Sequence, residues 1–397
     1  MFHKPSSLTH YSFPSQGIPD ITTRYTFNDH ISQLKKAHGP IAIDTERADG
    51  KRYYPRAYLI QIKRENSSTF LIDPIENAHN IPSLAHAIKQ EEWILHDAPQ
   101  DLPCLSLIDL QPSRLFDTFI AGALLGLRRL SLQKMLEDIL NVHIEKEHTA
   151  EDWSMRPIPQ AMRSYAALDV EFLHPLRHEL IEQLQRKERL SWVEEECTYI
   201  LHQKPRSAPK EPWRKLQKKY KITNRRSLAM LQLMWNTRDR LAQKRDIHPT
   251  RIISNENLAY LASKKPRSYG DVRSSKALRS QASRPYAQAL SKDAKKAWAL
   301  PENKLPSLAL TYSHANPHVS KDKDAHIEIL KHALKECASH TQINPRFLLT
   351  SSTIKDVARE EWKRSEDVEN LLRTHNVREW QIELLMPHVH QHMNLST

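Results

Sequence analysis

The feature that most constrains the fold is a short β-branched apolar run, residues 41–43, that leads directly into two carboxylates in the segment IAIDTE. Asp44 and Glu46 are two residues apart, and alternate side chains of an extended strand point to the same face. A strand here would bring two oxygen ligands to one point, as a metal site requires. Taken alone, the pair is more simply interpreted as a polar strand end at the surface.

Two later segments add acids to this pattern. In WILHDAPQDL, a strand-like run ends at His96, and Pro99 favours a helix start that would place Asp101 on the early turns. In SYAALDVEFL, Tyr165 and Asp169 are four residues apart in an uninterrupted helical pattern, so they share one helix face. Taken individually, Asp101 is typical of an exposed acid at a helix start. Tyr165 and Asp169 are typical of a core aromatic residue beside a surface acid.

The order D-x-E, then D, then Y-x-x-x-D resembles the DEDDy class of 3′-5′ exonucleases, and the ribonuclease D family in particular. The segments that carry the resemblance lie across residues 40–175 and are IAIDTE, YYPRAYLIQI, LHDAPQDL, LFDTFIAGALLG, TAEDWSMRP and YAALDVEFL. The C-terminal half resembles the HRDC modules of that family. The resemblance implies an α/β ribonuclease-H-like (DnaQ-like) exonuclease domain followed by two all-α HRDC-type domains. One residue departs from the pattern, because Arg47 follows D-T-E where many members have an apolar residue that could wedge against the terminal base.

The resemblance also implies catalytic roles. Asp44 would bridge two divalent ions, and Glu46 and Asp169 would complete the site of the first. Asp101 would hold the second ion largely through water. Tyr165 would orient the attacking water, because a phenol with a pKa near ~10 is a poor base but a good hydrogen-bond partner. Oxygen donors without cysteine or histidine pairs favour Mg²⁺ or Mn²⁺, and two ions about 3.5–4 Å apart suit phosphodiester hydrolysis.

Other residues are weaker candidates for substrate binding. His96 could lie near the terminal nucleotide, although a satisfied, partly buried histidine is the more common case. Gln61 in LIQI could touch the terminal sugar or only pair with a neighbouring strand. Asp117 is expected to cap its helix, and Trp153 and Arg156 to pack the catalytic helix in place. The candidates for contact with the nucleic-acid backbone are basic: Lys215, Lys218, Lys219, Arg225 and Arg226.

At 397 residues the chain exceeds the size of a single growing core, so two or three domains are expected. We expect the exonuclease domain at 1–203, a basic HRDC domain at 213–300 and an HRDC-like domain at 324–397. Proline-bearing stretches at 204–212 and 301–323 are interpreted as linkers.

Within the first domain, apolar runs and turn residues predict three strands, a helix, a strand, a helix, a strand and then helices. The turn at 64–67 suggests an antiparallel start. The predicted strands are 41–43, 57–62, 69–72, 93–95 and 115–116, and the predicted helical stretches are 78–89, 101–107 and 159–199. In the basic domain, Asn224 is predicted to cap a helix with apolar positions at Leu228, Leu231, Trp235 and Leu241.

A weak internal repeat supports two related helical modules. HPTRIISNENLAYLA at 248–262 aligns without gaps with NPRFLLTSSTIKDVA at 344–358. In both copies a turn proline precedes an apolar pair and a hydroxyl residue, Ser254 or Thr350, that could be the N-cap of the next helix. The first copy is the more basic, so the second is expected to have kept the fold and lost much of the phosphate affinity.

Positive charge is concentrated in the middle of the chain. Residues 201–300 hold 25 Lys and Arg against 6 Asp and Glu, whereas residues 1–200 hold 22 against 28. A local excess of this size is typical of a polyanion-binding module, since soluble surfaces usually mix both signs. Three scattered cysteines argue against a disulfide scaffold or zinc site, and no apolar stretch suits a signal peptide or membrane span. A cytoplasmic location is therefore expected.

The leading hypothesis is a metal-dependent 3′-5′ exoribonuclease that releases nucleoside 5′-monophosphates, with precursor tRNA as the substrate that the resemblance implies. We expect two divalent ions, Mg²⁺ or Mn²⁺, as cofactors, RNA 3′ ends as partners, no membrane and a monomer. One alternative keeps the chemistry but acts on DNA, because contacts to the 2′-hydroxyl are not readable from sequence. Another is a nucleic-acid-binding protein without catalysis, although all four acids are present.

Overall fold

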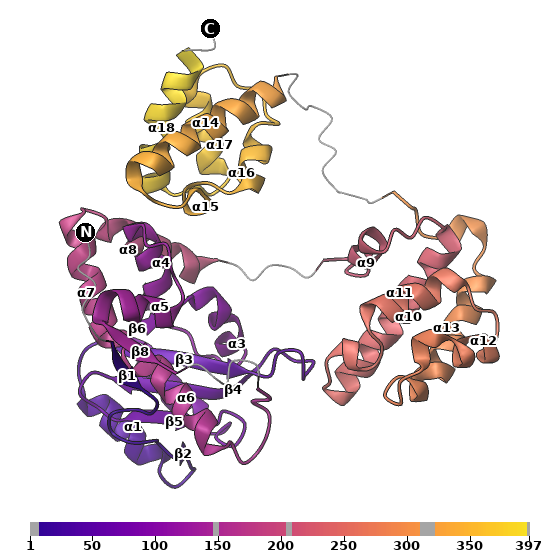
Figure 1. Ribbon diagram of the computed structural model, residues 1–397, viewed down its shortest axis with the longest axis horizontal. Coiled ribbons are helices and arrows are strands. Elements are labelled where there is room, and N and C mark those ends of the chain that lie inside the picture. Colours follow the sequence, from indigo (N-terminus) through magenta and orange to yellow (C-terminus); the bar gives the residue numbers. More distant parts are fainter. Residues whose placement is uncertain (1–7, 146–150, 204–208, 310–321, 395–397) are drawn as a thin grey trace.

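The chain forms an α/β domain and two helical modules (Figure 1), and the computed structural model describes residues 8–145, 151–203, 209–309 and 322–394. Of the linkers expected at 204–212 and 301–323, residues 204–208 and 310–321 lie outside the described residues. The start of the second expected linker instead packs on the helical module before it, because Leu305 is buried in the core of that module. The expected α/β exonuclease layout at the N-terminus and the helical character of the rest are confirmed.

A six-stranded sheet in the order β2-β5-β4-β3-β6-β7 forms the centre of the first domain. Its strands are β2 (Ile21–Thr22), β3 (Ile41–Arg47), β4 (Ala57–Arg64), β5 (Thr69–Ile72), β6 (Glu92–Leu95) and β7 (Arg114–Asp117). The predicted antiparallel start is confirmed, because β4 pairs antiparallel with both β3 and β5, while β6 runs parallel to β3. Strand β3 is longer than predicted, so the two acids of IAIDTE lie within the strand rather than after it.

Helices cover the sheet (Figure 1). They are α1 (Phe27–Lys36), α2 (Ile81–Ile88), α3 (Leu102–Ser106), α4 (Thr118–Leu125), α5 (Leu132–Met135), α6 (Gln160–Glu171), α7 (Leu173–Arg186) and α8 (Leu190–His202). The single helical stretch predicted at 159–199 is three helices. Phe172 leaves helical geometry at the first break, and Glu188 adopts a left-handed φ of 57° at the second. These breaks let α6 lie over β3, β4 and β5 while α7 and α8 reach β6 and β7.

Several elements were not predicted from the sequence, among them β2 and α1, which precede the first predicted strand. A parallel pair, β1 (Thr9–Tyr11) and β8 (Val142–Ile144), joins the N-terminal segment to the middle of the domain. A π-helical turn at Leu136–Leu140 follows α5. Short 3₁₀ turns occur at Ala98–Gln100, Pro249–Arg251, Lys276–Leu278, Arg284–Tyr286 and Glu302–Lys304.

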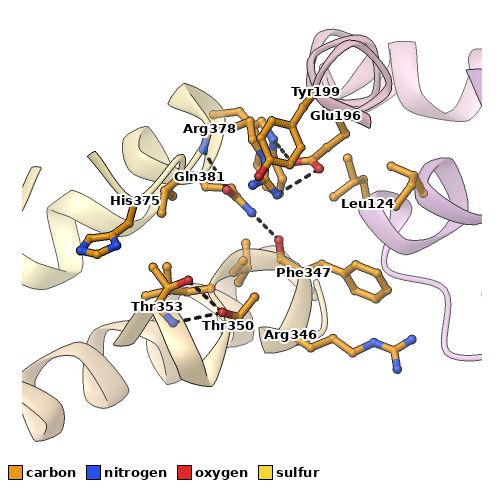
Figure 2. A pocket seen from close by; sticks show the side chains of 15 residues that line it. Leu124, Glu196, Tyr199, Arg346, Phe347, Thr350, Thr353, His375, Arg378 and Gln381 are labelled. Carbon is orange, nitrogen blue, oxygen red and sulfur yellow. Dashed lines mark hydrogen bonds and ion pairs between the residues drawn. The ribbon is translucent and has the colours of Figure 1, made fainter. Parts of the chain in front are cut away.

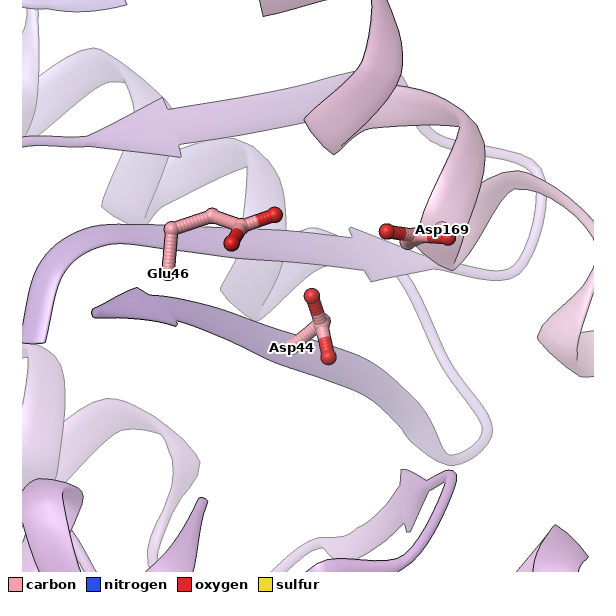
Figure 3. A group of neighbouring side chains, drawn as sticks. All are labelled: Asp44, Glu46 and Asp169. Carbon is pink, nitrogen blue, oxygen red and sulfur yellow. The ribbon is translucent and has the colours of Figure 1, made fainter. Parts of the chain in front are cut away.

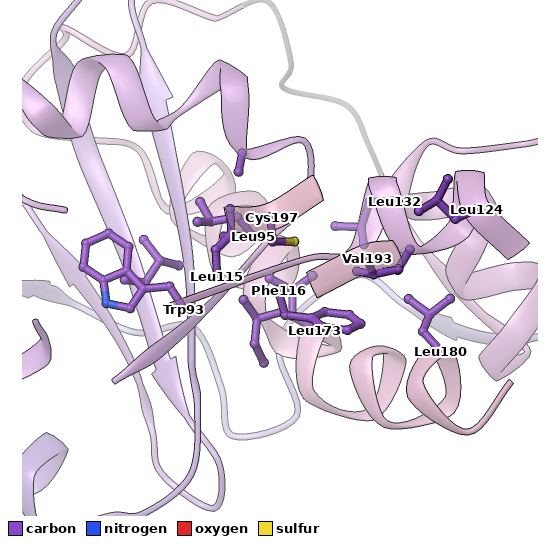
Figure 4. Packing of buried hydrophobic residues seen from close by; sticks show 14 of the residues in the cluster. Trp93, Leu95, Leu115, Phe116, Leu124, Leu132, Leu173, Leu180, Val193 and Cys197 are labelled. Atoms are coloured by element: carbon purple, nitrogen blue, oxygen red, sulfur yellow. The ribbon is translucent and has the colours of Figure 1, made fainter. Parts of the chain in front are cut away.

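The core of the first domain forms where the sheet meets α4, α7 and α8 (Figure 4). Trp93 and Leu95 from β6 are fully buried, and Phe116 from β7 packs with Leu173 and Val193. Burial of a large apolar side chain contributes about 1.5–3 kcal/mol relative to exposure. This packing fixes β6 and β7 beside β3 and so holds in place the central strand that carries the acids.

The basic module is a helical unit with its own core. It contains α9 (Arg214–Lys219), α10 (Arg225–Arg245), α11 (Asn255–Lys264), α12 (Tyr269–Ser274) and α13 (Ala287–Ala299). The predicted N-cap is confirmed, because the Asn224 side chain accepts a hydrogen bond from the Ser227 N–H. Leu228 and Leu231 are buried as predicted, whereas Trp235 and Leu241 are only partly buried.

The C-terminal module is also helical. It contains α14 (Lys323–Thr341), α15 (Pro345–Leu348), α16 (Ser351–Val357), α17 (Ser365–Thr374) and α18 (Glu379–Asn394). Both hydroxyl N-caps of the internal repeat are confirmed: Ser254 accepts from Asn257 N–H, and Thr350 accepts from Thr353 N–H. The buried residues of the C-terminal module form one cluster with those of the first domain, so these two parts share a continuous core.

All three cysteines are buried thiols. Among the described residues, no helix combines the length and the apolar character needed to cross a bilayer.

Candidate active site

Three of the four predicted acids come together on one side of the sheet (Figure 3). Asp44 and Glu46 project from β3 toward Asp169 on α6, and one oxygen from each carboxylate lies within 4.8 Å of the others. Asp169 is buried, while the other two are partly exposed to solvent. Three carboxylates this close repel one another unless protons or a cation offset the charge. Among the described residues, this is the one such group compact enough to hold a metal ion.

Strand geometry explains why these side chains meet. The two acids of β3 share a face because of the alternation of the strand, and a bulge in the pairing with β4 occurs between Glu46 and Arg47. Helix α6 packs across β3 and β4, so its inward face carries Asp169 toward the strand. Trp153, Ile158 and Met162 are buried in the small apolar cluster beneath this helix, which agrees with the packing role predicted for Trp153.

Arg156 has the packing role that was predicted for it. Its guanidinium donates to the Tyr58 and Trp153 carbonyls at 2.8 Å and pairs with the buried Asp73 carboxylate. These contacts fasten the segment before α6 to the sheet.

Tyr165 lies beside the acids, as predicted. It is buried, its ring packs with that of Trp153, and it belongs to the cluster under α6. Burial, then the neighbouring charges of Asp169 and Glu46, raise the pKa of Tyr165 above its ordinary value. The phenol is therefore kept protonated, which suits a hydrogen-bond donor and not a base.

Asp101 lies at the start of the helix that follows β6, as the sequence predicted. It is buried at the start of α3 and is not part of the compact group of three acids. It accepts a hydrogen bond of 2.9 Å from the Thr45 hydroxyl, so it is connected to the catalytic strand through the residue between the two acids. Burial raises the pKa of Asp101 to about 7, and the Thr45 hydrogen bond opposes this shift.

The side chain of Arg47, the residue after Glu46 on β3, is partly exposed. Its guanidinium donates to the Gln100 carbonyl and lies 3.6 Å from the Asp49 carboxylate. Together with Lys51 and Glu151, it lines an open hollow of about 520 Å³ next to Glu46. The positively charged side chain of Arg47 therefore occupies the position at which many members of the family were expected to have an apolar residue.

The weaker candidates have identifiable partners. His96 is partly buried, with a 2.9 Å hydrogen bond between its Nδ1 and the Thr118 hydroxyl and an edge contact to Phe119. Asp117 caps α4 as predicted, and its carboxylate also accepts from the backbone N–H groups of Asp97 and Ala98. The side chain of Gln61, opposite Asp44 in the strand pairing, is fully buried and has no hydrogen bond among the described residues.

The basic candidates separate into two groups. Arg225 and Arg226 donate to main-chain carbonyls between residues 297 and 306, so these guanidinium groups tie the module together and have few donors left for phosphate. Lys215, Lys218 and Lys219 on and beside α9 are exposed.

Sequence reasoning missed the contact between the catalytic strand and the basic module. The loop after β3 reaches Asp246, whose carboxylate accepts from the Tyr53 and Tyr54 N–H groups at 3.2 Å and from Arg56 at 2.9 Å. Tyr53 also donates to Asp239 at 3.0 Å. Asp246 ends α10 in a left-handed conformation with a φ of 47°, which aspartate adopts more readily than most residues other than glycine.

Sequence reasoning also missed the junction between the first domain and the C-terminal module (Figure 2). Arg378 pairs with Glu196 from α8, and the Trp380 indole donates to the same carboxylate at 3.0 Å. Phe347 meets Phe119, the neighbour of His96, at a ring distance of 5.9 Å. A cavity of about 180 Å³ lies among these side chains.

Comparison with protein-family models supports this division of the chain. Residues 19–185 match a 3′-5′ exonuclease family and residues 227–291 match the HRDC domain. Residues 315–393 match a 3′ to 5′ exonuclease C-terminal domain, so an HRDC match is found for one of the two helical modules.

Comparison with individual proteins gives relatives along most of the chain. Ribonuclease D of Psychromonas ingrahamii is 32% identical over 64% of this chain and 68% of its own length. Ribonuclease D of Escherichia coli is 30% identical over 70% of this chain and 74% of its own. A crystal structure of a protein from Bifidobacterium adolescentis is 29% identical, covers 98% of this chain and 100% of its own, and has a TM-score of 0.88.

Proposed function

This chain belongs to the ribonuclease D family of 3′-5′ exoribonucleases, and we propose that the group of carboxylates on β3 and α6 is the centre of its active site. Asp44, Glu46, Asp169 and Tyr165 are the residues that we assign to hydrolysis, with Asp101 as a fourth acid. The observation that carries the proposal is the convergence of three carboxylates from two elements that are about 120 residues apart in sequence.

The carboxylate group fits divalent cations. Its donors are hard oxygens, which suit Mg²⁺ or Mn²⁺ rather than zinc or copper. When bound, such ions lower the pKa of the attacking water and neutralise charge on the phosphate. Asp44 and Glu46 on β3 and Asp169 on α6 would hold the first ion (Figure 3). We assign Asp101, which accepts a hydrogen bond from Thr45 of β3, to a second cation position.

The remaining steps fall to the chain itself. Tyr165 holds its proton and is placed beside Asp169, so it can orient the attacking water by a hydrogen bond. Arg47 and Lys51 line the hollow next to Glu46, where they can contact phosphates of the RNA strand. His96 and Phe119 form an edge-to-face aromatic pair that suits contact with the terminal nucleotide.

The basic module is assigned to RNA capture. Of its five acids, Asp239 and Asp246 hold the loop after β3, Asp271 caps α12 and Asp293 is buried. This leaves the lysines and arginines in large excess on the surface. Lys264 and Lys276 lie over the Tyr260 ring at 5.4 and 4.5 Å, an aromatic and basic combination that suits single-stranded RNA.

We further propose that precursor tRNA is a substrate and that the C-terminal module is a second, HRDC-like fold. The matching N-caps of Ser254 and Thr350, each after a proline turn, support the second assignment. We assign the domains to 1–203, 213–300 and 324–397 and the two divalent ions to Mg²⁺ or Mn²⁺ in a monomer.

The test is a product ladder from a 5′-labelled pair of RNA and DNA strands of identical sequence, incubated with Mg²⁺, with Mn²⁺ or with chelator. We expect stepwise shortening of RNA with metal, none with chelator, and none from Asp44→Asn in either metal. Asp49→Asn is the matched control, because this exposed acid follows the same strand but lies outside the group of three. Degradation of DNA alone, or full activity of Asp44→Asn, would contradict the proposal.

A further inference from the structure

Gln61 on β4 carries a buried amide that the reaction proposed above does not use. Its side chain is fully buried, and neither Oε1 nor Nε2 has a hydrogen-bond partner among the described residues. A buried amide without partners costs free energy, because it has given up its hydrogen bonds to water. All residues from 57 to 62 are buried, so an apolar side chain would suit this position of the strand better than an amide.

The pairing of the strands points the Gln61 side chain at the carboxylate group. Gln61 is directly opposite Asp44 in the antiparallel register of β3 and β4, and Leu71 of β5 is its neighbour on the other side. Opposite residues of such a pair project from the same face, with Cβ atoms about 4.5–5.5 Å apart. Gln61 therefore shares the face of the sheet on which Asp44, Glu46 and Asp169 converge.

Helix α6 covers this face around Gln61. The helix packs on β3, β4 and β5, and Lys63, two residues after Gln61, lies 3.3 Å from the carboxylate of Glu171 at the end of the helix. Leu59, two residues before Gln61, belongs with Tyr165 to the buried cluster under α6. The amide is thus shielded from water, and a hydrogen bond to a charged group is stronger there than in solvent.

A carboxylate that binds a cation is usually supported from behind by a hydrogen-bond donor. Each acid of the group offers one oxygen to the common centre, and a carboxylate can accept further hydrogen bonds at the same time. Such donors fix the orientation of the ligand, and their loss typically weakens metal binding about 10–100-fold. Gln61 has two amide protons and a side chain long enough to cross from β4 to the carboxylate of Asp44.

We propose that Gln61 is a positioning residue of the metal centre, whose amide donates to the Asp44 carboxylate when a divalent ion is bound. The inference rests on the function proposed above, because it requires that Asp44 be a metal ligand. The amide would hold Asp44 in the orientation that the ion requires. Gln61 therefore acts through Asp44 and touches neither the ion nor the RNA.

The test measures metal binding without RNA, so that no contact with substrate contributes. Mn²⁺ is titrated into the full-length, chelator-stripped chain, and the free ion is followed by electron paramagnetic resonance. At the site that Asp44→Asn abolishes, Gln61→Met should bind Mn²⁺ about tenfold more weakly, because it keeps the length of the side chain and loses the donors. Its metal-free melting temperature should equal or exceed that of the wild type, since an unpaired buried amide has been removed.

Thr69→Val is the matched control. The hydroxyl of Thr69 on β5 is also buried without a partner among the described residues. Thr69 pairs with Lys63, so it projects from the same face of the sheet as Gln61 but lies outside the row that contains Asp44. The control should keep or raise the metal-free melting temperature and leave the affinity for Mn²⁺ unchanged.

A second measurement needs no substitution at Gln61. Among the described residues, the buried glutamines are Gln61, Gln217 and Gln381, and the last two donate to main-chain carbonyls in the helical modules. In a chain labelled with ¹⁵N-glutamine, these side-chain amides should exchange slowly with water. Mg²⁺ should shift the resonances of one protected amide in the wild type and of none in Asp44→Asn.

Three results would overturn the inference alone: equal Mn²⁺ affinity of Gln61→Met and the wild type, no amide shift with Mg²⁺, or a lowered metal-free melting temperature of Gln61→Met. The last would mean that the amide supports the strand and not the ion. Undiminished Mn²⁺ binding by Asp44→Asn would instead overturn the proposed active site, and the role of Gln61 with it.

Discussion

At the scale of single residues, the acids of the site are reached from the two opposite faces of strand β3. Asp44 and Glu46 use one face of β3 and meet Asp169, whereas Thr45 between them uses the other and donates to Asp101. The fourth acid is thus linked to the first three through the strand itself. A small change in the strand's twist would move both groups together.

Tyr165→Phe tests the role of the phenol. We expect turnover of a short RNA to fall by about 10²-fold or more, since the water loses its orienting hydrogen bond, while affinity for RNA stays within about twofold. Single-turnover hydrolysis and binding measured in Ca²⁺ give the two values. Tyr58→Phe, a buried tyrosine in the same apolar cluster, is the control and should retain turnover. Equal losses of binding and turnover in Tyr165→Phe would refute the assignment.

Asp101 gives a prediction for pH. Its pKa is raised to about 7 by burial, so the carboxyl binds a proton as the pH falls from 8 to 6 and the ionised form is lost. The rate should fall over this range because a cation ligand must be deprotonated. Since cation and proton compete, a higher Mg²⁺ concentration should move the midpoint to lower pH.

Two pH–rate profiles, at low and high Mg²⁺, test this prediction. Asp101→Asn should be slow at every pH. A midpoint that does not respond to Mg²⁺, or a normal rate in the variant, would show that Asp101 is not a metal ligand.

At the scale of elements, two loops determine how the parts of the molecule meet. The loop after β3 binds the end of α10 through Asp246, so the strand that carries the acids also carries the contact to the basic module. Gly126, which ends α4, contacts the loop after α14. Each loop joins a functional element to a distant module by a few named groups.

Asp246→Ala should separate the binding of long RNA by the basic module from the hydrolysis step at the carboxylate group. It removes three hydrogen bonds to the loop, so kcat/KM for a long RNA should fall several-fold, whereas cleavage of a dinucleotide, too short to span both parts, should not change. Glu256→Ala removes the same charge from an exposed position of the same module and is the control. Parallel losses on both substrates would mean that the loop shapes the active site directly.

Gly126→Ala should weaken the junction with the C-terminal module. Gly126 has a φ of 87°, and a Cβ there would lie 2.7 Å from the Gln342 carbonyl oxygen. Gly17 has a φ of 85° with open space around it, so Gly17→Ala carries the backbone strain without the clash. Thermal unfolding of both variants isolates the contact, and we expect Gly126→Ala to melt several degrees lower than Gly17→Ala. Equal melting temperatures would show that the contact adds nothing.

At the scale of the whole molecule, the two helical modules are attached to the first domain in different ways. The basic module has its own core and meets the first domain through hydrogen bonds, an ion pair and the packing of Tyr53, whereas the C-terminal module continues the core of that domain. A unit with a separate core can shift on binding RNA more easily than one that shares a core.

The exposed lysines of α9 should contribute to affinity as a set. The triple variant Lys215→Ala, Lys218→Ala and Lys219→Ala should bind RNA more weakly and should flatten the plot of log affinity against log salt. Each lost phosphate contact with a single strand reduces the slope by about 0.7, so a change of up to about 2 is expected. Alanine at Lys35, Lys36 and Lys89 removes the same charge from exposed positions of the first domain. An unchanged slope in the α9 variant would remove these lysines from the RNA path.

The sequence by itself determined what depends on neighbours along the chain. The alternation of β3, the helical spacing of Tyr165 and Asp169 and the caps at Asn224 and Asp117 follow from local periodicity and local hydrogen bonds. The tertiary structure alone decided which groups meet across more than fifty residues. Asp246 at the loop after β3 and Gln342 at Gly126 are such contacts, and so is the hydrogen bond from Thr45 to Asp101. They depend on how whole elements pack, and no pattern in a short window of sequence encodes that packing.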